Sequence, residues 1–301
     1  HNTHIEPAPF QKGVLMNYQQ FVTEVKEKVK SILGDSLKIE VVTTLKNNGT
    51  ERIGLSIADS AVNISPTIYL EEFYQYYNCM TSIDHIAQEV ISLYHEIQFD
   101  HDIDVNHIQD FSLAKHSIGY KLINSYLNEK LLEKIPYKYY LEYAIVFVLF
   151  IESEPYNQGA ILINNDMLRM WNTDIDEIYE IAHQNMPTLF PFSLVCELLD
   201  DADSDFLEDS PLYILTNEHR MFGASTFLYA DAFPYVAEKL KESFYIIPSS
   251  IHELIIVPES ISPCLEDLEN MIQDVNNTQI LPEEVLGDCA YYYDAIINRL
   301  S

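Results

Sequence analysis

Basic residues are scarce in this sequence. Its 301 residues include 17 Lys and Arg against 47 Asp and Glu, which gives a formal net charge of -30 at pH 7. A field of this sign repels nucleic-acid phosphates and anionic membrane surfaces. The shortage of cations therefore argues against direct binding to nucleic acid or to a membrane, and it favours a basic partner.

Cysteine is equally rare. The four cysteines lie far apart and form no CxxC pair, at Cys79, Cys196, Cys264 and Cys289. Zinc knuckles and redox motifs need closely spaced cysteines. We therefore expect neither a metal nor a cofactor, and thiols that stay reduced, as they do in the cytoplasm. Disulfide pairing is the alternative, which their spacing alone leaves open.

Long hydrophobic runs are missing as well. The longest, YAIVFVLFI at 143–151, has the length of a strand, whereas a membrane-spanning helix needs about 20 apolar residues. Residues 1–15 lack the basic and then apolar layout of a signal peptide. We expect them to be a tag remnant or a loose tail, and we expect the protein to be cytoplasmic.

Hydrophobic residues nevertheless make up 48% of the chain, enough for a globular core. Apolar positions at helical spacing predict helices at about 18–33, 81–97, 173–184, 231–244 and 265–275. Apolar runs between turn residues predict strands at about 37–45, 53–57, 62–70, 103–111, 143–151, 159–164, 213–217 and 289–296, and a pair of strands within 244–258. We expect an α+β fold with mixed, mainly antiparallel sheets and helices packed on one face, in two closely associated lobes.

A run of carboxylates suggests where the lobes divide. Residues 197–210 contain seven Asp and Glu and no basic residue, which is typical of a solvated loop. We therefore predict an N-terminal lobe at 16–200 and a C-terminal lobe at 201–301, with one continuous unit as the alternative.

The residues most typical of catalysis are Ser250, His252 and Glu253. Ser250 and His252 would share one face of an extended strand, as a nucleophile and its base could. The glycine-flanked GxSxG turn of many hydrolases is absent. The alternative is structural: residues 248–250 form the turn between two strands, and the hydroxyl groups bind turn amides.

A second candidate site, for ligand binding, lies in the segment TNEHRMFGA. Asn217, Arg220 and Gly223 follow a predicted strand, and a strand end that leads through glycine into a helix often binds a ligand. Here too a structural role in capping is the alternative.

Metal-binding patterns fail at specific positions. Alternate carboxylates at 100–104 and 201–205 have the spacing of a calcium loop but lack its turn glycine and its closing carboxylate. His95 and Glu96 begin a zinc-protease motif, but Phe99 stands where the second histidine belongs. We predict no metal site.

Several strings together resemble an uncharacterised bacterial family. They are LKNNGTERIGLSI, ISPTIYL, KLINSYLNEKLLEKIPYKYYLEYAIVF, LTNEHRMFGA, IPSSIHELIIVP and VNNTQILPEEVLGDCAYYYD. That family is a domain of unknown function, mostly from gut-dwelling Gram-positive anaerobes. The resemblance spans residues 16–300; it implies a cytoplasmic location and one continuous family unit, and it implies no activity.

These observations favour a noncatalytic cytoplasmic protein that binds another protein or a small ligand. The 21 tyrosines offer rigid amphipathic contact area of the kind that interfaces use. Two alternatives remain. One is an enzyme, hydrolytic in the simplest case, that uses the residues named above. The other is an acidic mimic of nucleic acid.

Overall fold

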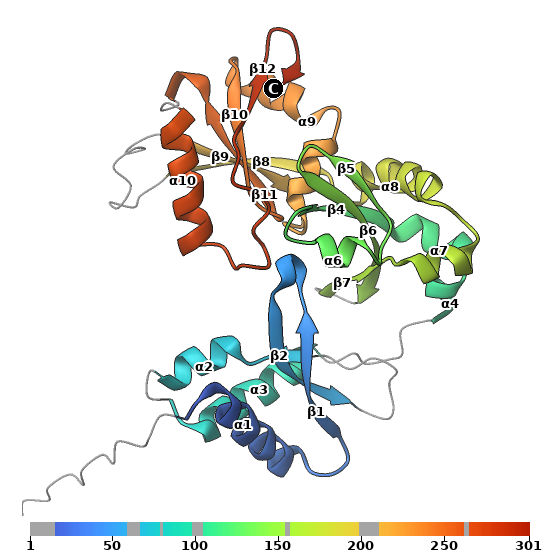
Figure 1. Ribbon diagram of the computed structural model, residues 1–301, viewed down its shortest axis with the longest axis vertical. Coiled ribbons are helices and arrows are strands. Elements are labelled where there is room, and N and C mark those ends of the chain that lie inside the picture. The colour runs from blue at the N-terminus through green and yellow to red at the C-terminus, as the bar shows by residue number, and fades with distance from the viewer. Residues whose placement is uncertain are drawn as a thin grey trace, which may run out of the picture. The chain divides into compact units, whose positions relative to one another are not determined.

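The computed structural model describes residues 16–58, 67–78, 81–97, 105–153, 157–198, 211–261 and 265–301. Outside these ranges lie the N-terminal tail, Cys79, Cys264, most of the acidic loop and both calcium-like stretches. The described residues form two compact units, one from 1–45 and 51–103 and the other from 46–50 and 104–301 (Figure 1).

The first unit packs helices on a small antiparallel sheet. Its elements are α1 (Tyr18–Leu33), β1 (Lys38–Leu45), β2 (Glu51–Ala58), β3 (Thr67–Tyr69), α2 (Glu71–Asn78) and α3 (Ile83–Ile97). The sheet order is β1-β2-β3. An Asn17–Gln20 capping box begins α1, and Gly34, with φ of 78°, ends it. The predicted helices and hairpin at 18–97 are confirmed.

The second unit begins with a four-stranded antiparallel sheet around a central strand. Strand β6 (Tyr143–Ser153) pairs with β4 (Ile118–Asn124) along one edge, and with β5 (Tyr137–Tyr140) and β7 (Asn157–Leu162) along the other. The accompanying helices are α4 (Val105–Gln109), α5 (Phe111–Ala114), η2 (Lys115–Ser117), α6 (Glu129–Leu132), α7 (Asn165–Trp171) and α8 (Ile175–Leu189). The predicted strand pair within 143–164 is confirmed.

The strand predicted at 103–111 is wrong, because its described part forms helices α4 and α5. Asp110 begins α5 by accepting a hydrogen bond from the Ser112 amide at 2.8 Å. The Ile108 carbonyl accepts a hydrogen bond from the Trp171 indole at 2.8 Å. Ile108 and Phe111, three residues apart, both pack on the core, which suits helical spacing.

A six-stranded antiparallel sheet completes the second unit. Its order is β13 (Arg299–Leu300), β12 (Tyr291–Asp294), β10 (Phe244–Ser250), β11 (Glu253–Pro258), β9 (Pro211–Asn217) and β8 (Phe192–Leu198). Strands β8 and β9 pair along their whole length. Position 200/201, where the sequence suggests a boundary, lies between these paired strands, and both strands belong to the second compact unit.

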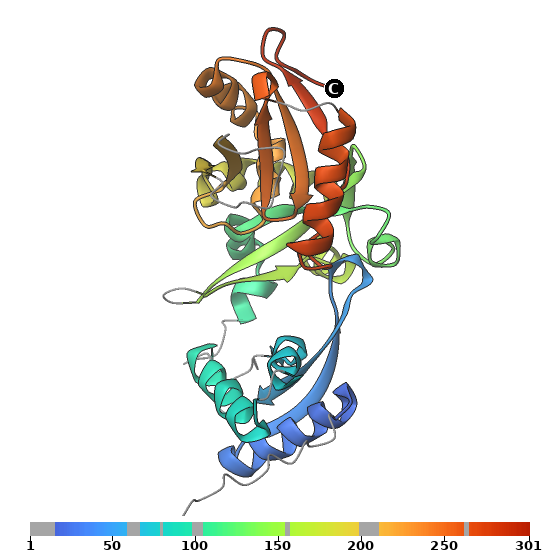
Figure 2. The same cartoon turned by 90° about the vertical axis from the view of Figure 1, so that its left-hand side faces the viewer.

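Helical segments cover both faces of this sheet. Helix α10 (Leu265–Thr278) lies along one face of the sheet (Figure 2). Its Leu268 and Ile272 pack against Ile247 and Val257. The other face meets η3 (Gly223–Leu228) and α9 (Ala232–Leu240), while η4 (Glu259–Ile261) follows β11. The α+β class is confirmed, but helices cover two faces of this sheet and not one.

The main core of the second unit lies between its two sheets, around the short helix η3. Buried side chains from both sheets meet there, among them Tyr120, Phe147, Phe244 and Ile256, and they pack with Phe227 of η3. No helix in the described ranges is long and apolar enough to cross a membrane.

Residues 46–50, which contain the 3-10 turn η1 (Asn47–Gly49), belong to the second unit. Asn48, with φ of 58°, donates its side-chain amide to the Val285 carbonyl at 2.7 Å. Its backbone amide donates to the buried Asn128 side chain at 2.9 Å. These bonds fix the position of the neighbouring Lys46.

Candidate ligand site

The loop that follows β9 is braced by Asn217. The side chain of this residue is only 1% exposed; its oxygen accepts from the amides of His219 and Met221, and its nitrogen donates to the Met221 carbonyl at 2.7 Å. All of these partners are backbone groups of the loop. Asn217 therefore shapes the loop, which is the structural alternative that its sequence position also allowed.

The loop places an aromatic ring by means of unusual backbone angles. Arg220 and Phe222 both have φ of 51°, in the left-handed region that few side chains adopt. The next residue, Gly223, has no room for a Cβ atom, which would lie 2.0 Å from the Thr216 hydroxyl and 2.2 Å from the His252 carbonyl. Only glycine permits this close approach of η3 to the turn after β10.

That turn consists of Ile251 and His252. The structural alternative placed the turn at residues 248–250. Pro248 and Ser249 instead lie within β10, and the turn follows that strand. The Ser250 hydroxyl accepts a hydrogen bond from the His252 amide at 3.1 Å. The hydroxyl group thus binds a turn amide, as that alternative expected.

The imidazole of His252 lies between the loop and a carboxylate. Its Nδ1 accepts a hydrogen bond from the Phe222 amide at 3.3 Å, and its Nε2 lies 3.6 Å from Glu284 Oε1. Burial and the charge of Lys121 lower the pKa of His252, against the opposing effect of the Arg220 carbonyl. The imidazole is therefore neutral at pH 7, with its proton on Nε2, facing Glu284.

Lys121 approaches the same loop from β4. Its ammonium group lies 4.8 Å from the centre of the Phe222 ring, and that ring stacks on His252 at 5.8 Å between centroids. The side chain is partly buried, and no hydrogen bond or ion pair joins its ammonium group to any residue that the structure describes. Burial, assisted by the charge of Lys46, lowers the pKa of Lys121 to about 8.

A protein-family comparison matches residues 18–295 to a family of unknown function, DUF5688. The chain belongs to that family. Searches of curated proteins and of solved structures found no match. The DUF5688 assignment covers both compact units and carries no activity, so chemistry has to be argued from the residues themselves.

The structure brings the two sequence-predicted groups of this DUF5688 protein together. Asn217 and Gly223 shape the loop, Ser250 and His252 lie at the turn beside it, and Glu253 begins β11. Arg220 is exposed on the loop. No hydroxyl among the described residues is hydrogen-bonded to the imidazole, and no three metal-binding side chains gather in those residues.

Sequence reasoning missed three members of the site: Lys121, Phe222 and Glu284. Lys121 had a visible signal, since it is the only charged residue in IGYKLIN, an otherwise buried strand. Phe222 lay within the segment already considered, but the sequence did not show that its ring stacks on His252 and faces Lys121. Glu284 is about thirty residues away from His252, and nothing in the sequence pairs them.

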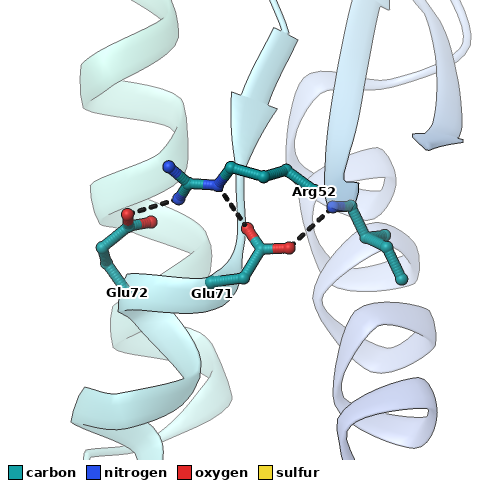
Figure 3. A network of polar contacts seen from close by, with 4 residues as sticks. Arg52, Glu71 and Glu72 are labelled. Carbon is teal, nitrogen blue, oxygen red and sulfur yellow. Dashed lines mark hydrogen bonds and ion pairs between the residues drawn. The ribbon is translucent and has the colours of Figure 1, made fainter. Parts of the chain in front are cut away.

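The first unit contains a contrasting polar cluster (Figure 3). Arg52 Nε lies 3.3 Å from Glu71 Oε2, and the same guanidinium also binds Glu72. Glu71 Oε1 accepts a further hydrogen bond from the Ile53 amide at 2.6 Å. Here the carboxylates of Glu71 and Glu72 pair with the guanidinium of Arg52. The cluster therefore joins α2 to β2, and the charge of Arg52 is already neutralised by the protein.

Proposed function

We propose that this chain is a noncatalytic cytoplasmic binding protein, and that its second unit binds a small organic anion at Lys121, Phe222 and His252. The observation that carries the proposal is the ammonium group of Lys121. It is partly buried and has no acidic partner among the described residues, in a protein with 47 carboxylates. The neighbouring Asn217 side chain and Ser250 hydroxyl, in contrast, are hydrogen-bonded to backbone groups.

Electrostatics favours an anion at this position. Two unit charges 4 Å apart attract by about 4 kcal/mol at the effective dielectric of a partly buried site, before desolvation is subtracted. A bound carboxylate or phosphate would supply the acceptors that Lys121 lacks. The Phe222 ring adds an apolar face, which suits a ligand with a flat or aliphatic body.

The net charge of the whole molecule and the local charge at the site favour different partners. The net charge of -30 favours a basic protein as a partner for the outer surface and repels nucleic acid and anionic membranes. Exposed charges beyond about 8 Å are screened at physiological salt, so the local cation determines binding in the site. The proposed small ligand and a basic surface partner are therefore compatible.

One observation favours an enzyme as the second candidate. His252 Nε2 lies 3.6 Å from Glu284 Oε1, which resembles a base and the carboxylate that orients it. However, Nδ1 already accepts the Phe222 amide, and the Ser250 hydroxyl faces the His252 amide. A binding role uses these contacts as they stand, whereas catalysis requires their rearrangement.

Calorimetric titration with benzoate tests the proposal, because benzoate combines a carboxylate with a ring that can face Phe222. Lys121→Met, which keeps the length of the side chain, should weaken binding at least tenfold, about 1.4 kcal/mol. Lys138→Met is the matched control: Lys138 also lies over a ring, that of Tyr179 at 4.6 Å, but it is paired with Asp176 at 2.7 Å.

Neutral benzamide should not bind, and the affinity for benzoate should fall as pH rises through about 8, where Lys121 loses its proton. The proposal fails if the wild-type protein binds neither benzoate nor inorganic phosphate, or if the Lys138 variant loses as much affinity as the Lys121 variant.

A further inference from the structure

We propose that Lys121 captures the carbonyl carbon of a small anionic aldehyde or keto acid as a reversible imine. This inference rests on the proposed anion site and specifies its ligand class. The ε-amino group is the nucleophile, and the aromatic wall of Phe222 and the neutral imidazole of His252 are its neighbours.

The geometry distinguishes Lys121 from a lysine in similar surroundings. Lys138 is 34% exposed and lies over the Tyr179 ring, but its ammonium group is fixed by Asp176, and this ion pair raises the pKa of Lys138. Lys121 also lies over an aromatic ring, that of Phe222, but no carboxylate among the described residues pairs with it. Among the described residues, only the Phe222 ring therefore stabilises the protonated form of Lys121.

Partial burial makes the free amine available at neutral pH. With its pKa lowered to about 8, about a fifth of the Lys121 side chains are unprotonated at pH 7.4. An ordinary lysine is unprotonated in about a thousandth of the molecules. The nucleophilic form is therefore enriched about two hundredfold, by the same desolvation that activates lysines in imine-forming sites.

The reaction balances without an oxidant or a reductant. The amine lone pair forms a bond to the carbonyl carbon while the π electrons move to oxygen, which gives a carbinolamine. The hydroxyl group then leaves as water, and the water carries both protons of the original amine. Solvent water can carry the protons between nitrogen and oxygen in these steps, because His252 Nδ1 already accepts the Phe222 amide.

Reductive trapping with glyoxylate and cyanoborohydride tests the inference on the full chain at pH 7.4. Peptide mass spectrometry should find Lys121 carboxymethylated at least ten times faster than Lys138. The rate at Lys121 should rise with pH through about 8, where half of the amine is unprotonated, and level off above that pH. Equal labelling of the two lysines would overturn the inference, as would a rate at Lys121 that still rises tenfold per pH unit above 9.

Lys121→Arg is the control for the position of trapping, because arginine forms no imine of this kind under these conditions. The variant should show no trapping at position 121. Benzoate binding without preferential trapping in the wild-type protein leaves the anion site intact and refutes imine formation. Preferential trapping without benzoate binding refutes the anion site alone.

Discussion

Gly223 shows how a single residue allows the candidate site to form. Its backbone lies against the Thr216 side chain and the His252 carbonyl, and it begins the buried helix η3. The Thr216 hydroxyl donates to that same carbonyl at 2.8 Å, so the loop, the turn and η3 are joined within a few ångströms. Any side chain at position 223 has to push these segments apart.

We expect Gly223→Ala to lower the free energy of unfolding by about 3 kcal/mol, because the added carbon would collide with backbone and cannot be absorbed by a flexible side chain. Gly159→Ala is the control: apart from its chain neighbours, the nearest atom of the described residues would lie 3.9 Å from its Cβ, and its effect should stay within about 0.5 kcal/mol. Urea unfolding measures both. Equal stabilities of the two variants would contradict the close approach at Gly223.

The sequence was informative about several of these residues but not about the role of each. It singled out Asn217, Gly223, Ser250 and His252, and the structure gathers all four around one loop and one turn. Their positions at strand ends were visible because turn residues are local signals. Lys121 was missed because its importance depends on the lack of an acidic partner among the described residues. Whether a lysine has such a partner is decided by tertiary contacts, which the sequence does not show.

At the scale of elements, the junction between β2 and α2 depends on Glu71. Burial acts to raise the pKa of this carboxyl, but the Ile53 amide, further hydrogen bonds and Arg52 outweigh it and lower the pKa below the ordinary value of 4.5. Glu71 also lies in the first turn of α2, where the helix dipole favours a negative charge. Glu72 meets Arg52 from a more exposed position, with 49% of its side chain accessible.

We expect Glu71→Gln to cost about 1–2 kcal/mol at pH 7, and Glu72→Gln less than about 0.5 kcal/mol. Because the folded pKa of Glu71 is depressed, its contribution is complete above 4.5 and is lost as pH falls through the folded value. The difference between wild type and Glu71→Gln should therefore shrink below pH 4. A difference that persists at pH 2 would contradict the ionic origin.

Element types were predicted better than their assembly. The helix at 18–33 and the hairpin that follows it carry strong periodic patterns, and both are present. The segment 103–111 misled, since Ile108 and Phe111 suit a strand edge or a helix face equally until the core around Trp171 decides. No local signal revealed that β8 and β9 pair across the acidic segment, because sheet pairing is set by contacts distant in sequence.

At the scale of the whole molecule, charge is the dominant property. A net charge of -30 on 301 residues repels itself and opposes compaction of the chain. The described ion pairs neutralise only part of it, and most of them are exposed, where each contributes little. Stability should therefore depend on the screening of the remaining carboxylates.

We expect the midpoint of thermal unfolding at pH 7 to rise by about 2–5 °C between 20 and 300 mM sodium chloride, since screening weakens the repulsion within the folded chain. Near pH 4.4, the isoelectric point of the sequence, the effect should vanish. Differential scanning calorimetry at both pH values measures it. A salt effect of the same size at the isoelectric point would contradict an origin in net charge.

The most direct test of the anion site is the pKa of the Lys121 amino group, followed by NMR of its Cε and Nζ, with Lys138 as the internal reference. We predict that Lys121 titrates near 8 in the free protein and at a higher pH with benzoate bound, while Lys138 titrates above 10.5 in both states. If Lys121 titrates together with Lys138 and benzoate does not move it, the ammonium group is not the unpartnered cation on which the proposed function depends.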